Sequence, residues 1–125
     1  MARRFDRDPA ASGPVVNGFA EGGFAVEGGV YRGLLLTPRS AREWTPPPIE
    51  ALTVDHLLEI VALDPAPEFL LLGTGAAMAF PPRALVRALD ERSIGIEAMD
   101  SRAAARTWGM LRAEERWIAA AIMPL

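Results

Sequence analysis

The chain has 125 residues and a formal net charge of −3 at pH 7, which favours one domain and argues against nucleic acid as a partner, because proteins that bind phosphate backbones carry basic patches. No apolar run reaches the roughly 20 residues of a membrane-spanning helix, and no apolar stretch follows the first arginines, so we expect a cytoplasmic protein with neither a membrane span nor a secretory signal. The absence of cysteine and lysine and the single histidine, His56, argue against disulfides, thiolate or lysine nucleophiles and multi-histidine metal sites, so we expect neither cofactor nor metal.

The N-terminal third is rich in glycine. Residues 1–13 are charged and lack periodicity, so we interpret them as a mobile arm in front of a single domain at residues 14–125. The glycines between Gly13 and Gly33 separate short apolar pieces, a pattern typical of an antiparallel β-meander. Glu27-Gly28-Gly29 predicts a tight hairpin turn, and residues 33–37 predict the most buried strand of the meander.

Residues 45–48, Thr-Pro-Pro-Pro, predict a stiff linker between this part and an α/β part, because consecutive prolines do not fit regular structure. Thr53 then predicts the N-cap of a helix over residues 54–63. His56 points away from the apolar stripe of that helix, so we expect a surface histidine. Trp44, with Trp108 and Trp117 further on, is expected to be a core or interface anchor.

The stretch over residues 69–75 organises the second half. Four large apolar residues followed by Gly-Thr-Gly indicate a strand that is covered on both faces. A helix from about Pro82 to Arg92 leads to a second strand at residues 96–99, and a crossover of this length implies parallel pairing. A third helix over residues 102–113, capped by Asp100 or Ser101, precedes an apolar run at 117–123 that predicts a last buried strand, with a helix as the alternative.

Two stretches are candidates for binding a ligand or a partner. Gly73-Thr74-Gly75 ends a strand, where ligands of open α/β sheets gather, although two glycines also serve simply to turn the chain. Asp100, Arg102 and Arg106 lie near the start of the third helix, with Thr107 beside them. Arginines there oppose the helix dipole, which hints at an anion or a partner's carboxylate, whereas a solvated face and a capping Asp100 are the plain alternatives. No pattern identifies a catalytic residue.

A family resemblance rests on a combination of motifs. These are Leu70-Leu71-Leu72-Gly73-Thr74-Gly75, Pro81-Pro82, Gly95-Ile96-Glu97-Ala98-Met99-Asp100 and Ala104-Ala105-Arg106-Thr107-Trp108, followed by Leu111, Glu114 and Arg116. With these motifs the chain resembles the Mth938-like family, also called DUF498/DUF598. Gly23 to Gly33 and Trp44 also fit, so the resemblance covers about residues 15–124. The resemblance implies a three-layer α/β fold, with a mixed central sheet flanked by helices and an N-terminal β-hairpin extension.

The resemblance also carries a functional expectation. The family includes mitochondrial complex I assembly factors, which act by binding partners and not by known catalysis. This chain has Ala105 in place of the family's usual cysteine, Trp108-Gly109 in place of an aromatic-asparagine pair, and Glu114-Glu115-Arg116 in place of a turn with a central glycine. These departures argue against an enzymatic site in the third helix and favour a scaffold or chaperone.

We therefore hypothesise a non-enzymatic bacterial protein that acts as an assembly factor or chaperone for a protein complex, with respiratory complex I as a candidate. The expected surface is the sheet edge at Gly73–Gly75 together with the helix start at Asp100 to Arg106. One alternative is a small-molecule or anion binder, an enzyme included, that uses the same crevice. Another is a homo-oligomer formed through exposed strands.

Overall fold

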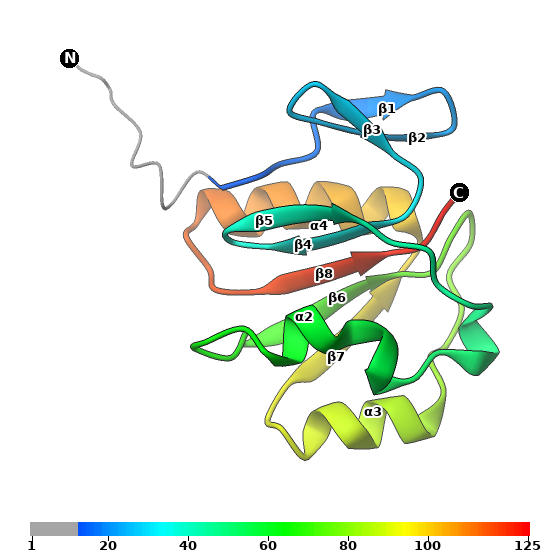
Figure 1. Cartoon of the computed structure of the whole chain (residues 1–125), viewed down its shortest axis with the longest axis vertical. Helices are drawn as coiled ribbons and strands as arrows, with labels where there is room; N and C mark the ends of the chain where they lie inside the picture. Colours follow the sequence, from blue (N-terminus) through cyan, green and yellow to red (C-terminus); the bar gives the residue numbers. More distant parts are fainter. Residues whose placement is uncertain (1–12) are drawn as a thin grey trace.

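The computed structural model describes residues 13–125, so the predicted arm lies outside the described residues except for Gly13. Within this range the chain forms a five-stranded sheet, a separate three-stranded sheet, and helices on both faces of the larger sheet (Figure 1). The strands are β1 (Gly18–Ala20), β2 (Gly23–Val26), β3 (Gly29–Tyr31), β4 (Leu34–Thr37), β5 (Ser40–Glu43), β6 (Phe69–Gly73), β7 (Gly95–Met99) and β8 (Ala119–Ile122). The helices are the 3₁₀ helices η1 (Ile49–Ala51) and η2 (Val54–Leu57) and the α-helices α2 (Leu58–Val61), α3 (Arg83–Asp90) and α4 (Ser101–Ala113).

The large sheet has the order β5-β4-β8-β6-β7. β6 pairs in parallel with both β7 and β8, whereas β4 pairs antiparallel with β5 and β8. The sheet is therefore mixed, and the connection from β6 through α3 to β7 is the parallel crossover that the sequence predicted. The C-terminal apolar run forms the strand β8 inside the sheet, so the helical alternative is wrong. The predicted three-layer α/β fold is confirmed.

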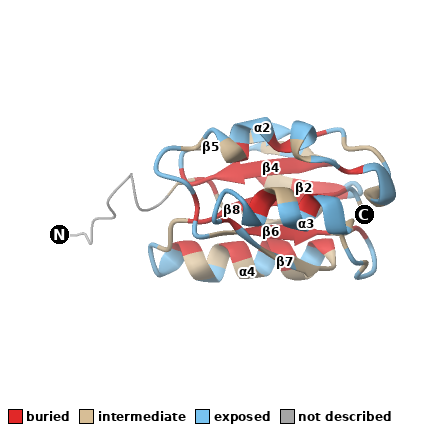
Figure 2. Cartoon of the chain, turned by 90° about the horizontal axis from the view of Figure 1, so that it is seen from below, coloured by how far each residue is buried: buried red, intermediate tan, exposed pale blue. Residues whose placement is uncertain are grey.

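The central strand is buried on both faces because its leucines alternate between two cores. Leu70 and Leu72 pack toward α3 and the short helices before β6, and Leu71 packs toward α4. All three are at most 1% exposed. Figure 2 shows this pattern as buried strands between helices whose outer faces are exposed. Alternation along a strand sends successive side chains to opposite faces, so a continuous apolar run requires a layer on each side.

The N-terminal strands form the predicted antiparallel meander in the order β1-β2-β3. Glu27 and Gly28, between β2 and β3, have φ values of 45° and 86°, as a two-residue hairpin turn with two positive φ angles requires. The strand predicted over residues 33–37 is the exception. It forms β4 in the large sheet, where Leu34 and Leu36 enter one core and Leu35 the other. The meander could not have buried both of its faces.

The predicted helix over residues 54–63 is correct in place but not in type. Residues 54–57 form the 3₁₀ helix η2, and only Leu58–Val61 are α-helical. The indole Nε1 of Trp44 donates a hydrogen bond to the carbonyl of His56 at 3.1 Å. A continuous α-helix would offer that carbonyl to the amide four residues later, so the contact with Trp44 favours the tighter first turn. His56 is exposed, as predicted, and its Nδ1 accepts the amide of Thr53 at 3.0 Å.

The tryptophans anchor the core to different extents. Trp44 and Trp108 are 7% and 0% exposed, and Trp117 is half-buried. The Nε1 atom of Trp108 donates to the carbonyl of Pro14 at 2.8 Å inside the protein, whereas that of Trp117 donates to the carbonyl of Pro65 at 2.6 Å at the surface. The burial of Trp108 therefore ties the first described residues to α4.

We expect Trp108→Phe to lower the free energy of unfolding by about 2 kcal/mol, because the buried Pro14 carbonyl loses its donor. Equilibrium urea denaturation measures this change. The matched control is Trp117→Phe, with an expected change within about 0.5 kcal/mol because water can replace the lost donor at the surface. Equal losses in the two variants would contradict the assignment of Trp108 as the buried anchor.

Candidate functional site

The two stretches singled out in the sequence lie side by side where β6 ends and α4 begins. The amide of Thr74 donates to the carbonyl of Met99 at 2.8 Å, and the amide of Ser101 donates to the carbonyl of Gly75, also at 2.8 Å. The turn after β6 is therefore hydrogen-bonded to the turn after β7. Parallel strands bring their carboxyl ends to one edge of the sheet, which is why stretches so far apart in the chain meet here.

A buried serine hydroxyl holds this junction together. The side chain of Ser101 is 0% exposed, and its Oγ accepts the amide of Gly75 at 2.8 Å while donating to the carbonyl of Met123 at 2.7 Å. It thus joins the turn after β6, the start of α4 and the residue after β8. The helix cap itself is Asp100, whose Oδ1 accepts the amide of Ala103 at 2.9 Å. The capping alternative for Asp100 is confirmed, whereas the structural role of Ser101 was not predicted.

Gly73 permits a close approach between β6 and α4. A Cβ atom placed on it would lie 2.9 Å from Ser101 Oγ and 3.1 Å from the Cβ of Ala104. The carbonyl of Gly73 accepts the amide of Met123 at 2.9 Å. Gly73 and Gly75 are both buried, so the inner side of this turn is filled by the protein itself. Binding of a ligand at Gly73 to Gly75 stays a prediction.

The remaining predicted site residues do not converge on one cavity. Arg102 is exposed, and its guanidinium carbon lies 5.6 Å from the centroid of the Phe19 ring, on the side of the meander. Arg106 is also exposed and lines a small hollow of about 180 Å³ with residues 16–19. Thr107 lies on the flank of α4 that faces β7, where its hydroxyl donates to the sulfur of Met99 at 3.5 Å. The arginines and Thr107 therefore serve different surfaces.

The loop after β6 displays an aromatic side chain that sequence reasoning missed. The hydroxyl of Thr74 donates to the carbonyl of Ala77 at 2.8 Å and accepts the amide of Ala79 at 3.0 Å. These two bonds order a loop on which Met78 is 46% and Phe80 81% exposed. The position of Phe80 directly before Pro81-Pro82 was a signal in the sequence, because a residue outside regular structure contributes little to a core.

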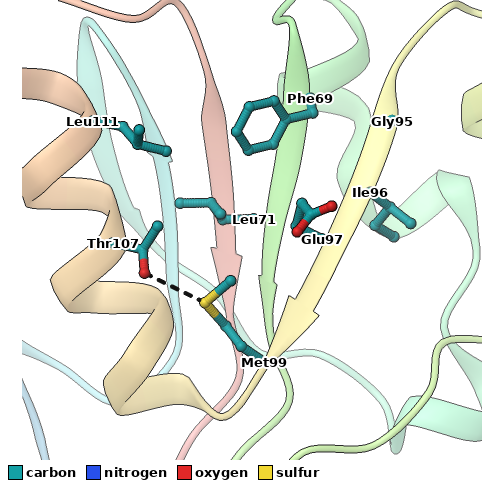
Figure 3. Close-up of a pocket in the computed structure, with 8 residues that line it drawn as sticks. All are labelled: Phe69, Leu71, Gly95, Ile96, Glu97, Met99, Thr107 and Leu111. Carbon is teal, nitrogen blue, oxygen red and sulfur yellow. Dashed lines mark hydrogen bonds between the residues drawn. The ribbon is translucent and has the colours of Figure 1, made fainter. Parts of the chain in front are cut away.

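A second feature, the β7 hollow, has a volume of about 360 Å³ and lies between α4 and β7 (Figure 3). Its walls come from three elements: Phe69 and Leu71 of β6, Gly95, Ile96, Glu97 and Met99 of β7, and Thr107 and Leu111 of α4. The lining is apolar except for Glu97 and Thr107. No sequence pattern pointed to it, because it depends on how far α4 extends across the sheet.

One ion pair closes the end of β6 that lies opposite the Gly-Thr-Gly turn. The guanidinium of Arg116 donates to Glu68 Oε1 from Nη2 at 2.7 Å and from Nε at 3.1 Å. These hydrogen bonds, together with the positive charge of Arg116, hold the pKa of the Glu68 carboxyl below its ordinary value. The same contact raises the pKa of Arg116. The pair links the start of β6 to the turn that precedes β8.

Two further classes of site are absent from the described part of the chain. Between Gly13 and Leu125, no three acidic, histidine or cysteine side chains gather closely enough to hold a metal ion. In the same range, no helix combines the length and apolar character needed to cross a bilayer.

The chain matches one protein family and is similar to several known proteins. Residues 16–123 match a family described as "Protein of unknown function (DUF498/DUF598)". An uncharacterised protein of Rhodobacter capsulatus is 32% identical over 121 residues, which cover 95% of this chain and 92% of that protein. A Danio rerio protein named NADH dehydrogenase [ubiquinone] 1 alpha subcomplex assembly factor 3 is 29% identical over 116 residues, covering 92% of this chain and 67% of that protein.

A solved structure shares the fold. The solution NMR structure of a Bordetella pertussis protein, described as a Mth938-like domain, superposes with a TM-score of 0.78 at 26% sequence identity. The superposition covers 99% of this chain and 92% of that chain. It agrees with the resemblance that the motifs at residues 70–75 and 95–100 indicated.

We expect Ser101→Ala to lower the free energy of unfolding by about 3 kcal/mol, because the amide of Gly75 and the carbonyl of Met123 both lose a buried partner. Urea denaturation provides the measurement. Thr107→Val is the control on the same helix, and its expected cost is below about 1 kcal/mol, since its hydroxyl contacts only a weak sulfur acceptor. A Ser101→Ala protein as stable as Thr107→Val would show that the junction is not held by this hydroxyl.

We expect Arg116→Gln to raise the pKa of Glu68 toward its ordinary value, as followed by NMR of the side-chain carboxyl carbon during a pH titration. Because the folded-state pKa is lowered, the pair stabilises the protein above the unfolded-state pKa and loses this effect as pH falls through the folded-state pKa. The acid dependence of stability should therefore be weaker in the variant. An unchanged Glu68 titration would refute the ion pair.

Proposed function

This chain belongs to the DUF498/DUF598 family, and we propose from that premise that it is a non-enzymatic binding protein that helps a protein complex to assemble. The relative from Danio rerio bears the name of a complex I assembly factor. We extend that role to this chain, with respiratory complex I as the candidate complex and the cytoplasm as the place of action. An assembly factor needs a surface for a protein partner and no catalytic group.

The observation that carries this proposal is the display of Phe80. A large aromatic side chain that is 81% exposed gains little from folding, yet exposed aromatic anchors dominate many protein interfaces. Met78 on the same loop adds further apolar area. We name residues 76–80 the display loop.

The display loop is also ordered before any partner arrives. Thr74 holds it through hydrogen bonds to Ala77 and Ala79, and Thr74 is itself fixed by the bond from its amide to Met99. A loop that is already ordered loses less conformational entropy on binding. In this proposal the predicted site residues Gly73, Thr74 and Gly75 position the display loop, and they need not contact the partner themselves.

The geometry favours a partner over an anion at the crevice. The amide and carbonyl of Gly75 are both bonded to Ser101, and the carbonyl of Gly73 is bonded to Met123. An anion site needs donors that are free to turn toward the ligand, and these groups are engaged. Arg102 is directed to the ring of Phe19, so it does not supply the missing charge.

The test joins binding to assembly. The tagged chain is produced at its native level, the NADH dehydrogenase of the cells is resolved on native gels, and the proteins retained by the chain are quantified. We expect Phe80→Ala to reduce partner retention about tenfold, the change that corresponds to a loss of ~1.4 kcal/mol, and to reduce the amount of assembled complex. Its urea midpoint should not change, because Phe80 is exposed.

Leu58→Ala is the matched control, since Leu58 is 61% exposed on α2, outside the display loop. It should retain the partner and support assembly like the natural chain. Normal assembly in cells that lack the chain, together with no partner lost on Phe80→Ala, would overturn the proposed function.

A further inference from the structure

β7 has an unpaired backbone edge and also borders an apolar hollow. β7 ends the strand order, so no strand pairs with its outer side within residues 13–125. An edge strand presents backbone donors and acceptors that a further strand can use. On the face of α4, this same strand is bordered by the hollow, as Figure 3 shows. Backbone groups and an apolar recess therefore adjoin each other along one strand.

Three residues of different chemical character follow one another along the face of β7 that lines the hollow. Gly95, Glu97 and Met99 alternate along the strand and line the hollow on the side of α4, whereas Ile96 also borders the hollow but packs against the core on the other face of the sheet. Gly95 leaves open the space of a side chain, and a Cβ built on it would lie at an ordinary 3.6 Å from the Cβ of Phe69. Met99 contributes a flexible apolar wall, and Glu97 places a carboxylate between these two positions.

The carboxylate of Glu97 determines which kind of partner side chain the hollow favours. Glu97 is exposed and forms no ion pair with any residue of the described chain. Phe69, Leu71 and Leu111 line the same hollow with apolar surface. A carboxylate in such surroundings is best matched by a basic side chain whose aliphatic stem packs on the apolar walls.

We propose that β7 binds an extended segment of a partner protein as an added strand, whose alternate side chains enter the β7 hollow. Every second residue of an added strand faces the same side of the sheet, so three of the partner's side chains lie beside Gly95, Glu97 and Met99. We assign these partner side chains as apolar, basic and apolar, in that order. A large apolar side chain fills the space at Gly95, and a lysine or arginine meets Glu97. The order is symmetric, so either strand direction satisfies it.

A second copy of the chain fits this edge poorly. Full antiparallel overlap of two β7 strands places Glu97 opposite Glu97, and like charges directly opposite each other destabilise a strand pair. The proposal concerns a different surface from the display loop and needs no particular complex. Its failure would leave the role of Phe80 standing, and the converse also holds.

The probe is the peptide Thr-Phe-Thr-Arg-Thr-Leu-Thr with blocked termini, titrated into the full ¹⁵N-labelled chain and followed by NMR. We expect saturable shifts at the amides of residues 95–99. The same peptide with glutamate in place of arginine should bind about fivefold more weakly, the upper range for one exposed ion pair. With Glu97→Arg the preference should invert, so that the glutamate peptide binds more tightly.

Two variants test whether peptide binding depends on the hollow itself. One fills the hollow and leaves the backbone edge of β7 in place, and the other changes the net charge of the protein at a distant position. Gly95→Phe fills the recess without a backbone clash and should abolish the shifts while keeping the urea midpoint near that of the natural chain. Glu43→Arg makes the same change of charge on β5, at the opposite edge of the sheet, and should leave both affinities unchanged within twofold.

Several outcomes overturn the proposal. One is the absence of saturable shifts, in which case Glu97 only protects the edge against pairing. Another is an equal affinity for the two peptides. Shifts at residues 95–99 that depend on protein concentration alone would identify a second copy as the occupant. Shifts there on replacing Arg3, Arg4 and Arg7 by glutamate would identify the N-terminal segment of the chain itself.

Discussion

The structure depends on one buried hydroxyl. Ser101 Oγ joins the amide of Gly75 to the carbonyl of Met123, and the missing side chain of Gly73 lets α4 come close enough for this contact. The contact fixes where α4 begins on the sheet. From that start the helix packs over β6 and β8 and leaves a recess beside β7. The same junction holds Thr74, and Thr74 orders the display loop. The display loop and the β7 hollow therefore both depend on the contact that Ser101 makes at the start of α4.

The two edges of the large sheet show how differently one sheet can end. β5 has four residues, and Arg42 on it forms an ion pair at 2.5 Å with Glu59 of α2. β7 has five residues, and its carboxylate Glu97 has no counterion in the described chain. Charged side chains commonly protect edges from unwanted pairing. On β5 the charge of Arg42 is already matched by Glu59, whereas Glu43 on β5 and Glu97 on β7 form no ion pair within the described chain. Glu97 differs from Glu43 in that it borders the β7 hollow, which we propose a binding partner enters.

The sequence predicted those parts that rest on local chemistry. The run Leu70 to Leu72 indicated a strand with both faces buried, and the alternation of its leucines between two cores bears this out. Glu27-Gly28 indicated a hairpin turn, because positive φ angles favour glycine. Asp100 indicated a helix cap, and its carboxylate accepts the expected amide. Each prediction needed only a residue and its neighbours. The type of the helix after Thr53 was not predictable, because it depends on a hydrogen bond from distant Trp44.

By itself, the amino-acid order determined the α/β class, the strand, helix and strand order from β6 through α3 to β7, the helix α4 that follows, and the meeting of the turns after β6 and β7. Hydrophobic periodicity and turn chemistry act over a few residues, so they can be read from the chain. Only the tertiary structure decided that β4 joins the large sheet, that the Ser101 hydroxyl bonds to Gly75 and Met123, that Phe80 is exposed, and that β7 borders a hollow. These features depend on which surfaces α4 and the meander cover, and burial is a property of the packed whole.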